Sequence, residues 1–313
     1  MKFRPRPRSA WIRIASCSAL LLTVIGCAPF VAIGVRVLYR RAELPRAQIR
    51  EDIAYLAGTD AQDDAHQLDL YLPTGRDWPL IVFVHGGNWD AGDKDTRVGA
   101  ADVYANIGRY YASRGIGTAV INYRLQPSAS WRGQVNDVRA AVQWGLDSIA
   151  AYGGRPEALF LMGHSAGTQL ISHVAFTADT ALRLGLRGVI AVSGAALDLV
   201  DPITWALGED PAFYARRFRA GDQSERWREE ASAIAQLSGY APPFLVLHAG
   251  GEKPGLKRQS QLLVEALRRH GTPCSLVVVP AQSHSRIVLT LSRPDRTAAP
   301  AIEAFVRQNT PPR

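Results

Sequence analysis

The serine at position 165 stands in a pattern that can make a hydroxyl group nucleophilic. The peptide GHSAG at residues 163–167 follows an apolar run at 158–162 and leads into a helix-compatible stretch. A G-x-S-x-G pattern between a strand and a helix is typical of a nucleophile elbow, whose strained turn exposes the serine hydroxyl. Glycines on both sides let strand and helix approach each other without a Cβ clash. The helix start adds free N–H groups and a partial positive charge beside Ser165.

A second motif could stabilise the negative charge that acyl transfer creates. The peptide HGGNW at residues 85–89 follows the apolar run at 80–84. The carbonyl oxygen of the reacting group becomes an oxyanion, and preorganised backbone N–H donors must meet it. A glycine-rich loop upstream of an elbow supplies such donors, and the N–H group of Ala166 adds another. The two motifs together predict acyl transfer through a covalent serine intermediate.

The serine needs a base, and the base needs an acid that orients it. When an elbow carries such a triad, the chain order is serine, acid, histidine. His284 lies in a polar loop directly after the last predicted strand, which is where the base should be. A surface loop histidine is the alternative interpretation. The other six histidines fall before the sheet, inside the two motifs or on helices and strand ends: His66, His85, His164, His173, His248 and His270.

Two acids compete for the position between the serine and the histidine. The loop after the predicted strand at 244–247 contains Glu252 as its only acid. Asp198, after the preceding strand, is the rival. A glutamate is one methylene longer than an aspartate, yet its carboxylate can still accept a hydrogen bond from an imidazole Nδ1–H group. We favour Glu252 because the acid is expected on the loop after the strand at 244–247.

Apolar periodicity predicts the elements that must position these residues. Strands are expected at 68–72, 80–84, 117–123, 158–162, 188–192, 244–247 and 275–279, and helices at 103–114, 135–149, 256–269 and 299–307. Strands that alternate with helices form a doubly wound, mostly parallel sheet. Residues 198–240 are charged and aromatic and interrupt this alternation. We therefore expect one α/β domain at 49–313 with a small cap insertion at about 198–240.

Seven short segments together resemble α/β-hydrolase esterases. They are HGGNW at 85–89, GDK at 92–94, NYRL at 122–125, D-V-x-x-A-V-x-W at 137–144, YGGRPE at 152–157, LMGHSAG at 161–167 and RQS at 258–260. The resemblance covers most of residues 68–290 and is strongest to the carboxylesterase, arylformamidase (kynurenine formamidase) and isoprenylcysteine methylesterase group. The acid loop of that group often reads H-G-x-x-D, whereas Ala249 and Glu252 stand at those positions here.

The resemblance implies an α/β-hydrolase fold, with Ser165 as nucleophile, Glu252 as acid and His284 as base. It also implies that Gly87 and Asn88 form the oxyanion hole, beside Ala166. The expected function is hydrolysis of a carboxylic ester of a small molecule. Two alternatives remain: an arylformamidase-type hydrolase of an activated amide, and a catalytically silent hydrolase fold that binds a partner at the membrane.

The positive charge of the chain is confined to its N-terminus. The formal net charge is +8, and residues 1–50 alone sum to +9, so that residues 51–313 sum to −1. A basic patch that binds nucleic acid would have to lie on the folded body. We therefore expect no nucleic-acid partner.

Residues 14–35 form an apolar stretch of 22 residues that carries no charge. About 20 such residues span a bilayer as a helix, so we expect a membrane anchor between a basic tail at 1–13 and a linker at 36–48. The linker is expected to be a solvated spacer, and the catalytic body is expected on the extracytoplasmic side. A cleaved signal peptide is one alternative, and a lipoprotein signal acylated at Cys27 is the other.

Other features of the sequence receive no catalytic role. No Cys/His cluster has the spacing of a zinc site and no G-x-x-x-x-G-K-[ST] segment is present, so no metal or cofactor is expected. Cys274, the only cysteine after residue 27, is expected to be a buried thiol on a strand. Arg124 and Asp137 could hold substrate, but a buried ion pair that supports the sheet is the simpler expectation. The aromatic residues of the cap could line a pocket or only pack the cap.

Overall fold

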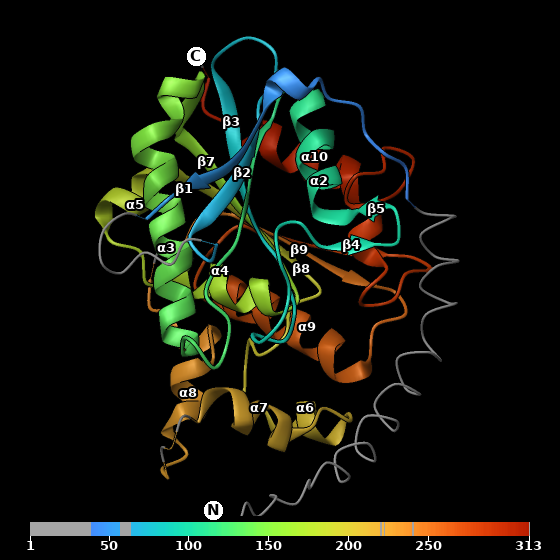
Figure 1. The fold of residues 1–313 in the computed structure, drawn as a ribbon. Coiled ribbons are helices and arrows are strands. Elements are labelled where there is room, and N and C mark those ends of the chain that lie inside the picture. Colours follow the sequence, from blue (N-terminus) through green and yellow to red (C-terminus); the bar gives the residue numbers. More distant parts are fainter. Residues whose placement is uncertain (1–38, 57–63, 220, 222, 240, 313) are drawn as a thin grey trace, which may run out of the picture.

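A mostly parallel sheet forms the centre of the molecule (Figure 1). The computed structural model describes residues 39–56, 64–219, 221, 223–239 and 241–312. The strands of the sheet are β1 (Ile49–Ala54), β2 (Gln67–Tyr71), β3 (Trp78–Val84), β6 (Gly117–Ile121), β7 (Gly154–His164), β8 (Leu186–Val192), β9 (Phe244–Ala249) and β10 (Cys274–Val279). Their order within the described residues is β1-β2-β6-β3-β7-β8-β9-β10. The strands from β6 to β10 are parallel, whereas β2 is antiparallel to both of its neighbours. The predicted mostly parallel, doubly wound sheet is confirmed.

Helices cover both faces of this sheet. One face packs against α3 (Trp131–Ser148), α4 (Ala166–Phe176) and α9 (Pro254–Arg269), and the other against α2 (Val103–Ser113) and α10 (Ala298–Asn309). The short elements outside residues 198–240 are η1 (Arg46–Gln48), β4 (Arg97–Val98), β5 (Ala101–Asp102), η2 (Ile149–Tyr152), α5 (Thr180–Gly185) and η4 (Ile287–Thr290).

The central strand β3 is apolar along its whole length, and both of its faces are buried. In β3, Leu80 and Val82 belong to the core shared with α3, α4 and α9. Ile81 and Phe83, which alternate with them, belong to the core shared with α2 and α10. Successive side chains of a strand point to opposite faces of the sheet. Because both faces are buried here, apolar residues occupy both sets of positions, and the usual alternation of apolar and polar residues is absent.

The structure moves some of the predicted boundaries. Helix α3 begins at Trp131, four residues before the expected start at Val135, and the side chain of Ser130 accepts a hydrogen bond from the N–H group of Gly133 at its N-terminus. Serine is a favoured residue at this capping position, so the earlier start has a local cause. Strand β1 was not expected at all, because its sequence IREDIA lacks a regular apolar alternation. Cys274 lies on β10 as expected, but it is only partly buried.

In the described part of the expected solvated spacer, residues 39–48, most residues are exposed, but several also contact the folded body. Tyr39 donates a hydrogen bond to the carboxylate of Asp102, at the N-terminus of α2. Asn106, on α2, accepts from the N–H group of Ala42 at 2.7 Å and donates to the carbonyl of Arg40 at 2.8 Å. Residues 39–44 therefore pack onto the body instead of leading away from it.

The segment expected as a cap is helical and lies at one end of the molecule, at the bottom of Figure 1. Its elements are α6 (Pro202–Ala206), α7 (Pro211–Phe218), α8 (Arg226–Ala231) and η3 (Ile234–Gln236). Asp201 and Asp210 each cap the helix that follows them, and a proline occupies the first turn of both helices. The described part of this segment contains no strand, as its sequence suggested.

The predicted tail at 1–13 and the predicted anchor at 14–35 lie outside the described residues. In the part of the chain that the structure does describe, none of the helices has both the length and the apolar character that crossing a membrane requires.

Asp137 and Arg124 form the expected ion pair at the carboxyl edge of the sheet. Asp137, on α3, is 2% exposed, and its carboxylate accepts hydrogen bonds from the Arg124 guanidinium at 2.6 Å and the Arg124 backbone N–H at 3.0 Å. The Nε2 atom of His66 lies 3.2 Å from the same carboxylate. This buried carboxylate therefore joins α3 to the segments that flank β2 and β6.

We expect Asp137→Ala to lower the free energy of unfolding by about 3 kcal/mol, because it leaves a largely buried guanidinium without its partner. The estimate is at the lower end for a broken buried pair, since the Arg124 side chain is 25% exposed. Urea unfolding followed by tryptophan fluorescence measures the change. Asp147→Ala, at an exposed position of the same helix, is the matched control and should cost less than about 0.5 kcal/mol. Equal losses in the two variants would contradict a structural role for the pair.

Candidate active site

Ser165 lies in a sharp turn between β7 and α4. Its φ and ψ angles are 54° and −119°, outside the regions that L-residues normally adopt. A Cβ atom at Gly163 would lie 2.6 Å from the carbonyl oxygen of Gly167, and one at Gly167 would lie 2.3 Å from the carbonyl oxygen of Val84. Both glycines are therefore required by the close crossing of the helix over the strands. This is the geometry of a nucleophile elbow.

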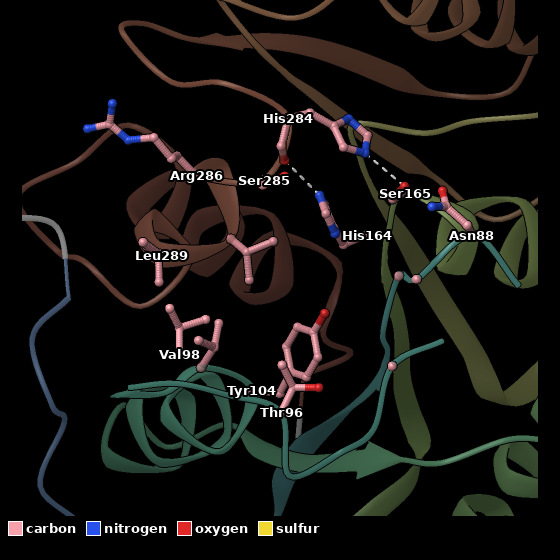
Figure 2. Close-up of a pocket in the computed structure, with 15 residues that line it drawn as sticks. Asn88, Thr96, Val98, Tyr104, His164, Ser165, His284, Ser285, Arg286 and Leu289 are labelled. Atoms are coloured by element: carbon pink, nitrogen blue, oxygen red, sulfur yellow. Dashed lines mark hydrogen bonds between the residues drawn. The ribbon is translucent and has the colours of Figure 1, made fainter. Parts of the chain in front are cut away.

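The structure brings Ser165, His284 and Glu252 into one chain of hydrogen bonds. His284 Nε2 lies 2.8 Å from Ser165 Oγ. A dashed line marks this hydrogen bond in Figure 2. His284 Nδ1 lies 2.9 Å from Glu252 Oε1. The three side chains come from the carboxyl ends of three parallel strands: Ser165 follows β7, Glu252 follows β9 and His284 follows β10. Parallel strands end at the same edge of a sheet, so residues far apart in the sequence meet there.

Glu252 is held as a carboxylate although it is 4% exposed. Burial raises the pKa of its carboxyl group, but the hydrogen bond from His284 and the charge of that imidazole outweigh burial, with a smaller effect of the Ser193 hydroxyl. The net result is a pKa below its usual value. A carboxylate in this position fixes the orientation of the imidazole ring and favours an imidazolium ion.

Asp198, the other candidate acid, forms its hydrogen bonds outside the triad. Asp198 Oδ1 accepts hydrogen bonds from the backbone N–H groups of Val200 at 2.9 Å and Asp201 at 3.1 Å. It therefore stabilises the turn that leads into α6. His173 donates to a backbone carbonyl of the cap, and His270 lies at the end of α9 beside the carbonyl of Ala266. These hydrogen bonds assign both histidines to the framework and not to the site.

The glycine-rich loop turns back beside Ser165. Gly87, Asn88 and Trp89 all have positive φ angles, of 134°, 54° and 66°. A Cβ atom at Gly87 would lie 1.9 Å from the carbonyl oxygen of Ala91, so only glycine fits this position. Asn88 lies next to Ser165 in Figure 2, and Ala166 is the first residue of α4. Gly87 and Asn88 line the same cavity as Ser165, and Ala166 directly follows Ser165 in the chain.

Residues that the sequence did not assign to the site hold this loop in place. Trp89 is 1% exposed, and its indole N–H donates to Gln169 Oε1 at 3.1 Å. Gln134 Nε2 donates to the Trp89 carbonyl at 2.7 Å, and the Tyr123 hydroxyl donates to the His85 carbonyl at 3.0 Å. These partners lie on other elements, and a single sequence carries no signal for such distant pairs.

The segments GDK at 92–94 and NYRL at 122–125 hold the end of the glycine-rich loop in place. The Lys94 ammonium, 3% exposed, lies 3.0 Å from Asp69 and 2.7 Å from Asp52. The Asn122 side chain accepts from the Lys94 backbone N–H at 2.6 Å and donates to Asp93 at 3.1 Å. The segments at 92–94 and 122–125 therefore have a structural explanation: they fix the end of the glycine-rich loop to β2 and β6.

Ser165 lies where two cavities meet. One, of about 330 Å³, has a mostly apolar far wall of Val98, Val103, Tyr104, Val288 and Leu289 (Figure 2). The other, of about 470 Å³, lies under the cap and is lined by Phe213, Tyr214, Glu209 and Lys253 among others. Ser165, Asn88 and His284 belong to both linings. Among the described residues, no group of three or more Cys, His, Asp or Glu side chains is placed to hold a metal ion.

Comparison with known proteins places this site in context. The BD-FAE family model matches residues 68–195. The esterase LipQ of Mycobacterium tuberculosis is 30% identical over 246 residues, which are 75% of this chain and 56% of LipQ. Isoprenylcysteine alpha-carbonyl methylesterase of Arabidopsis thaliana is 25% identical over 263 residues, or 77% of this chain and 58% of that enzyme. The chain thus spans little more than half the length of these relatives.

Solved structures show the same fold over nearly the whole length. An inhibited esterase B from Lactobacillus rhamnosis has a TM-score of 0.70 and 22% identity, and the match covers 93% of this chain and 97% of that one. An esterase from Pyrobaculum calidifontis has a TM-score of 0.68 and 16% identity, with 92% of each chain covered. The elbow, the sheet order and these structures together show the α/β-hydrolase fold, and the sequence is similar to serine esterases of that fold.

Proposed function

We propose that the protein hydrolyses carboxylic esters of small molecules through an acyl-enzyme on Ser165. The observation that carries the proposal is the continuous path of hydrogen bonds from Ser165 Oγ through the His284 ring to the buried carboxylate of Glu252. A serine hydroxyl is a weak nucleophile unless a base takes its proton, and the base works best when an acid holds its ring. The esterase names of the relatives support the same reaction.

The reaction has two halves that use the same groups. His284 Nε2 takes the proton of Ser165 as Oγ attacks the ester carbonyl, and the N–H groups of Gly87, Asn88 and Ala166 stabilise the oxyanion. The protonated histidine then gives the proton to the leaving alcohol, so an acyl group remains on the serine. Water, deprotonated by His284, attacks this acyl group, and His284 returns the proton to Ser165 Oγ as the acid leaves. Glu252 stabilises the imidazolium in both halves without taking the proton itself.

The substrate class follows from the cavities beside Ser165. The apolar walls of the smaller cavity suit the hydrocarbon part of an ester, because burial of apolar surface is favourable there. The cavity under the cap contains both charged and aromatic side chains and suits a more polar part. We therefore propose an ester with one hydrocarbon side and one polar side.

We expect full-length protein in detergent to react with a fluorophosphonate probe and to hydrolyse p-nitrophenyl butyrate. Ser165→Ala should abolish labelling and lower kcat by at least about 10⁴-fold, since no other group can form the acyl-enzyme. Ser172→Ala, which changes a buried serine of the same helix, is the matched control and should retain both activities.

The same assay separates the alternatives. Faster turnover of N-formylkynurenine than of the aryl ester would assign an arylformamidase-type activity instead. A folded wild type that neither labels nor hydrolyses would contradict the proposed function and favour a silent binding protein.

The choice of acid is tested by a second pair of variants. Glu252→Gln keeps the shape of the side chain but removes the charge that stabilises the imidazolium, so kcat should fall by about 10³-fold or more. Asp198→Asn should leave kcat within about twofold of the wild type and lower only the melting temperature. Steady-state kinetics and thermal unfolding measure both effects. A harmless Glu252→Gln together with an inactive Asp198→Asn would show that the acid is Asp198.

We further propose that residues 14–35 anchor the protein in a membrane, with the body on the extracytoplasmic side. The proposal rests on 22 residues without a charge between Arg13 and Arg36. The double variant Leu21→Arg and Ile25→Arg should release the protein from carbonate-washed membranes, because each arginine costs about 3 kcal/mol at the centre of a helix in a bilayer.

Cys27→Ser is the control for this proposal, because it removes the acylation site and keeps the stretch uncharged. The variant should stay in the membrane fraction with its full mass. Release of Cys27→Ser would assign a lipoprotein signal. A membrane-free wild type that lacks its first residues by mass spectrometry would assign a cleaved signal peptide.

A further inference from the structure

The histidine directly before the nucleophile contacts the loop that carries the base. His164 Nε2 lies 2.9 Å from the backbone carbonyl oxygen of His284, and this bond is drawn in Figure 2. Because His164 is covalently attached to Ser165, the bond links the two partners of the proton transfer by a path that does not pass through their reacting atoms. It is separate from the bond between Ser165 Oγ and His284 Nε2.

The proton on His164 can be placed on one nitrogen. A carbonyl oxygen only accepts hydrogen bonds, so Nε2 of His164 must carry a proton. Nδ1 is buried and has no hydrogen-bond partner in the described part of the chain. A Cβ atom at Gly86 would lie only 3.0 Å from this Nδ1 atom, so the ring is tightly packed on that side. A second proton on Nδ1 would be buried without an acceptor.

His164 therefore stays neutral while His284 changes its charge during the reaction. Burial lowers the pKa of His164 to about 3, and the neighbouring His284 ring, 5.1 Å away between ring centroids, lowers it in the same direction. At neutral pH the Nε2–H donor is always present. A neutral ring also avoids a second positive charge beside the imidazolium that forms on His284.

Three successive carbonyl groups fix the loop of His284 to three different parts of the site. The carbonyl of Gln282 accepts from the N–H group of Gly251 at 2.8 Å, beside the acid. The carbonyl of Ser283 accepts from the N–H group of Ile287 at 3.0 Å, in η4. The carbonyl of His284 accepts from His164, at the elbow. Only the last of these three bonds joins the loop to the segment that carries the nucleophile.

We propose that His164 is a positioning residue, which holds the backbone of His284 at a fixed distance from the elbow and so keeps its imidazole in reach of Ser165. The inference rests on the proposed function, because it concerns the base of that reaction. Without the bond the loop keeps its ties to the acid loop and to η4, but the distance between base and nucleophile is less constrained. Misplacement of a reacting group by about 1 Å can cost 100-fold in rate.

His173 provides a matched control within the same chain. It lies on α4, is 3% exposed, and its Nε2 atom lies 3.0 Å from the carbonyl oxygen of Ala231. Burial lowers the pKa of His173 to about 4, so it too is neutral. The two histidines thus share burial, charge state and type of bond. They differ in what they hold, since Ala231 belongs to the cap helix α8 and His284 is the base.

The test replaces each histidine by asparagine and by glutamine in the full-length protein. A glutamine amide can reach the position of Nε2 and donate the same hydrogen bond, whereas the shorter asparagine cannot. His164→Ala is a second variant without a donor, in case a buried asparagine prevents folding. The readouts are kcat and KM for p-nitrophenyl butyrate, the rate of fluorophosphonate labelling and the melting temperature.

We expect His164→Asn and His164→Ala to lower kcat and the labelling rate by about 10- to 100-fold, with KM within about twofold of the wild type. His164→Gln should restore kcat to within about threefold of the wild type. His173→Asn should lower the melting temperature as much as His164→Asn does, but leave kcat within about twofold. A stability effect alone would not produce this difference between the two positions or the rescue by glutamine.

The inference is wrong if His164→Asn and His164→Ala keep kcat within twofold, if His164→Gln is as slow as these variants, or if His173→Asn is equally slow. Failure of the proposed function has a different signature. In that case the folded wild type neither labels nor hydrolyses the ester, and the inference falls with it. An active wild type with unaffected His164 variants would reject the inference and leave the proposed function intact.

Discussion

The close crossing of α4 over the ends of β3 and β7 is the constraint on which the site depends. Gly167 packs against the carbonyl of Val84, and Gly163 packs against Gly167, at distances that no Cβ atom could share. This contact forces Ser165 into a backbone conformation that costs about 1–3 kcal/mol. Two bonds offset part of that cost: the Ser165 N–H group donates to the Val192 carbonyl at 3.0 Å, and Thr168 Oγ1 donates to the Gly163 carbonyl at 2.8 Å. Strands β7 and β8 thus both stabilise the strained backbone at Ser165.

The acid and the base depend on a different property of the sheet. Strands β9 and β10 are neighbours with aligned registers, so the loops that follow them leave the sheet side by side. The bond from the Gly251 N–H group to the Gln282 carbonyl joins these loops directly. Glu252 would be costly to bury as a free carboxylate, and His284 supplies the partner that makes its burial possible. The same bond that orients the base therefore also stabilises the fold.

The parts of the structure that sequence could predict are those with a local signature. Apolar runs predicted the parallel strands, and the GHSAG peptide predicted the elbow. The helices α6 and α7 also have a local signature, since Asp201-Pro202 and Asp210-Pro211 each place a capping residue before a proline. Strand β1 had none, because its antiparallel pairing with β2 at the edge of the sheet leaves all six of its residues exposed or partly exposed.

The contacts that position Glu252 and Trp89 could not be predicted, because they join residues that are distant in the sequence. The loop after β9 identified Glu252 as a candidate, but only geometry separates it from Asp198, whose carboxylate is used by the turn before α6. The bond between Trp89 and Gln169 spans 80 residues, and neither residue type indicates the other. Long-range polar contacts of this kind depend on the packed fold and not on any local pattern.

Helix α7 of the cap contacts the glycine-rich loop at 85–89, and the aromatic residues of this helix both pack against the loop and line a cavity. Phe218 contacts the Trp89 ring at 4.7 Å between centroids, and Arg217 Nε donates to the Asn88 carbonyl at 3.0 Å. Phe213 and Tyr214, one turn earlier on α7, line the cavity beside Ser165. The two interpretations of the cap, as pocket wall and as packing, therefore both apply, because Tyr214 lines the cavity and also packs against the Phe218 and Trp89 rings. Because Arg217 holds the carbonyl of Asn88, any movement of α7 would change the position of a predicted oxyanion donor as well as the shape of the cavity.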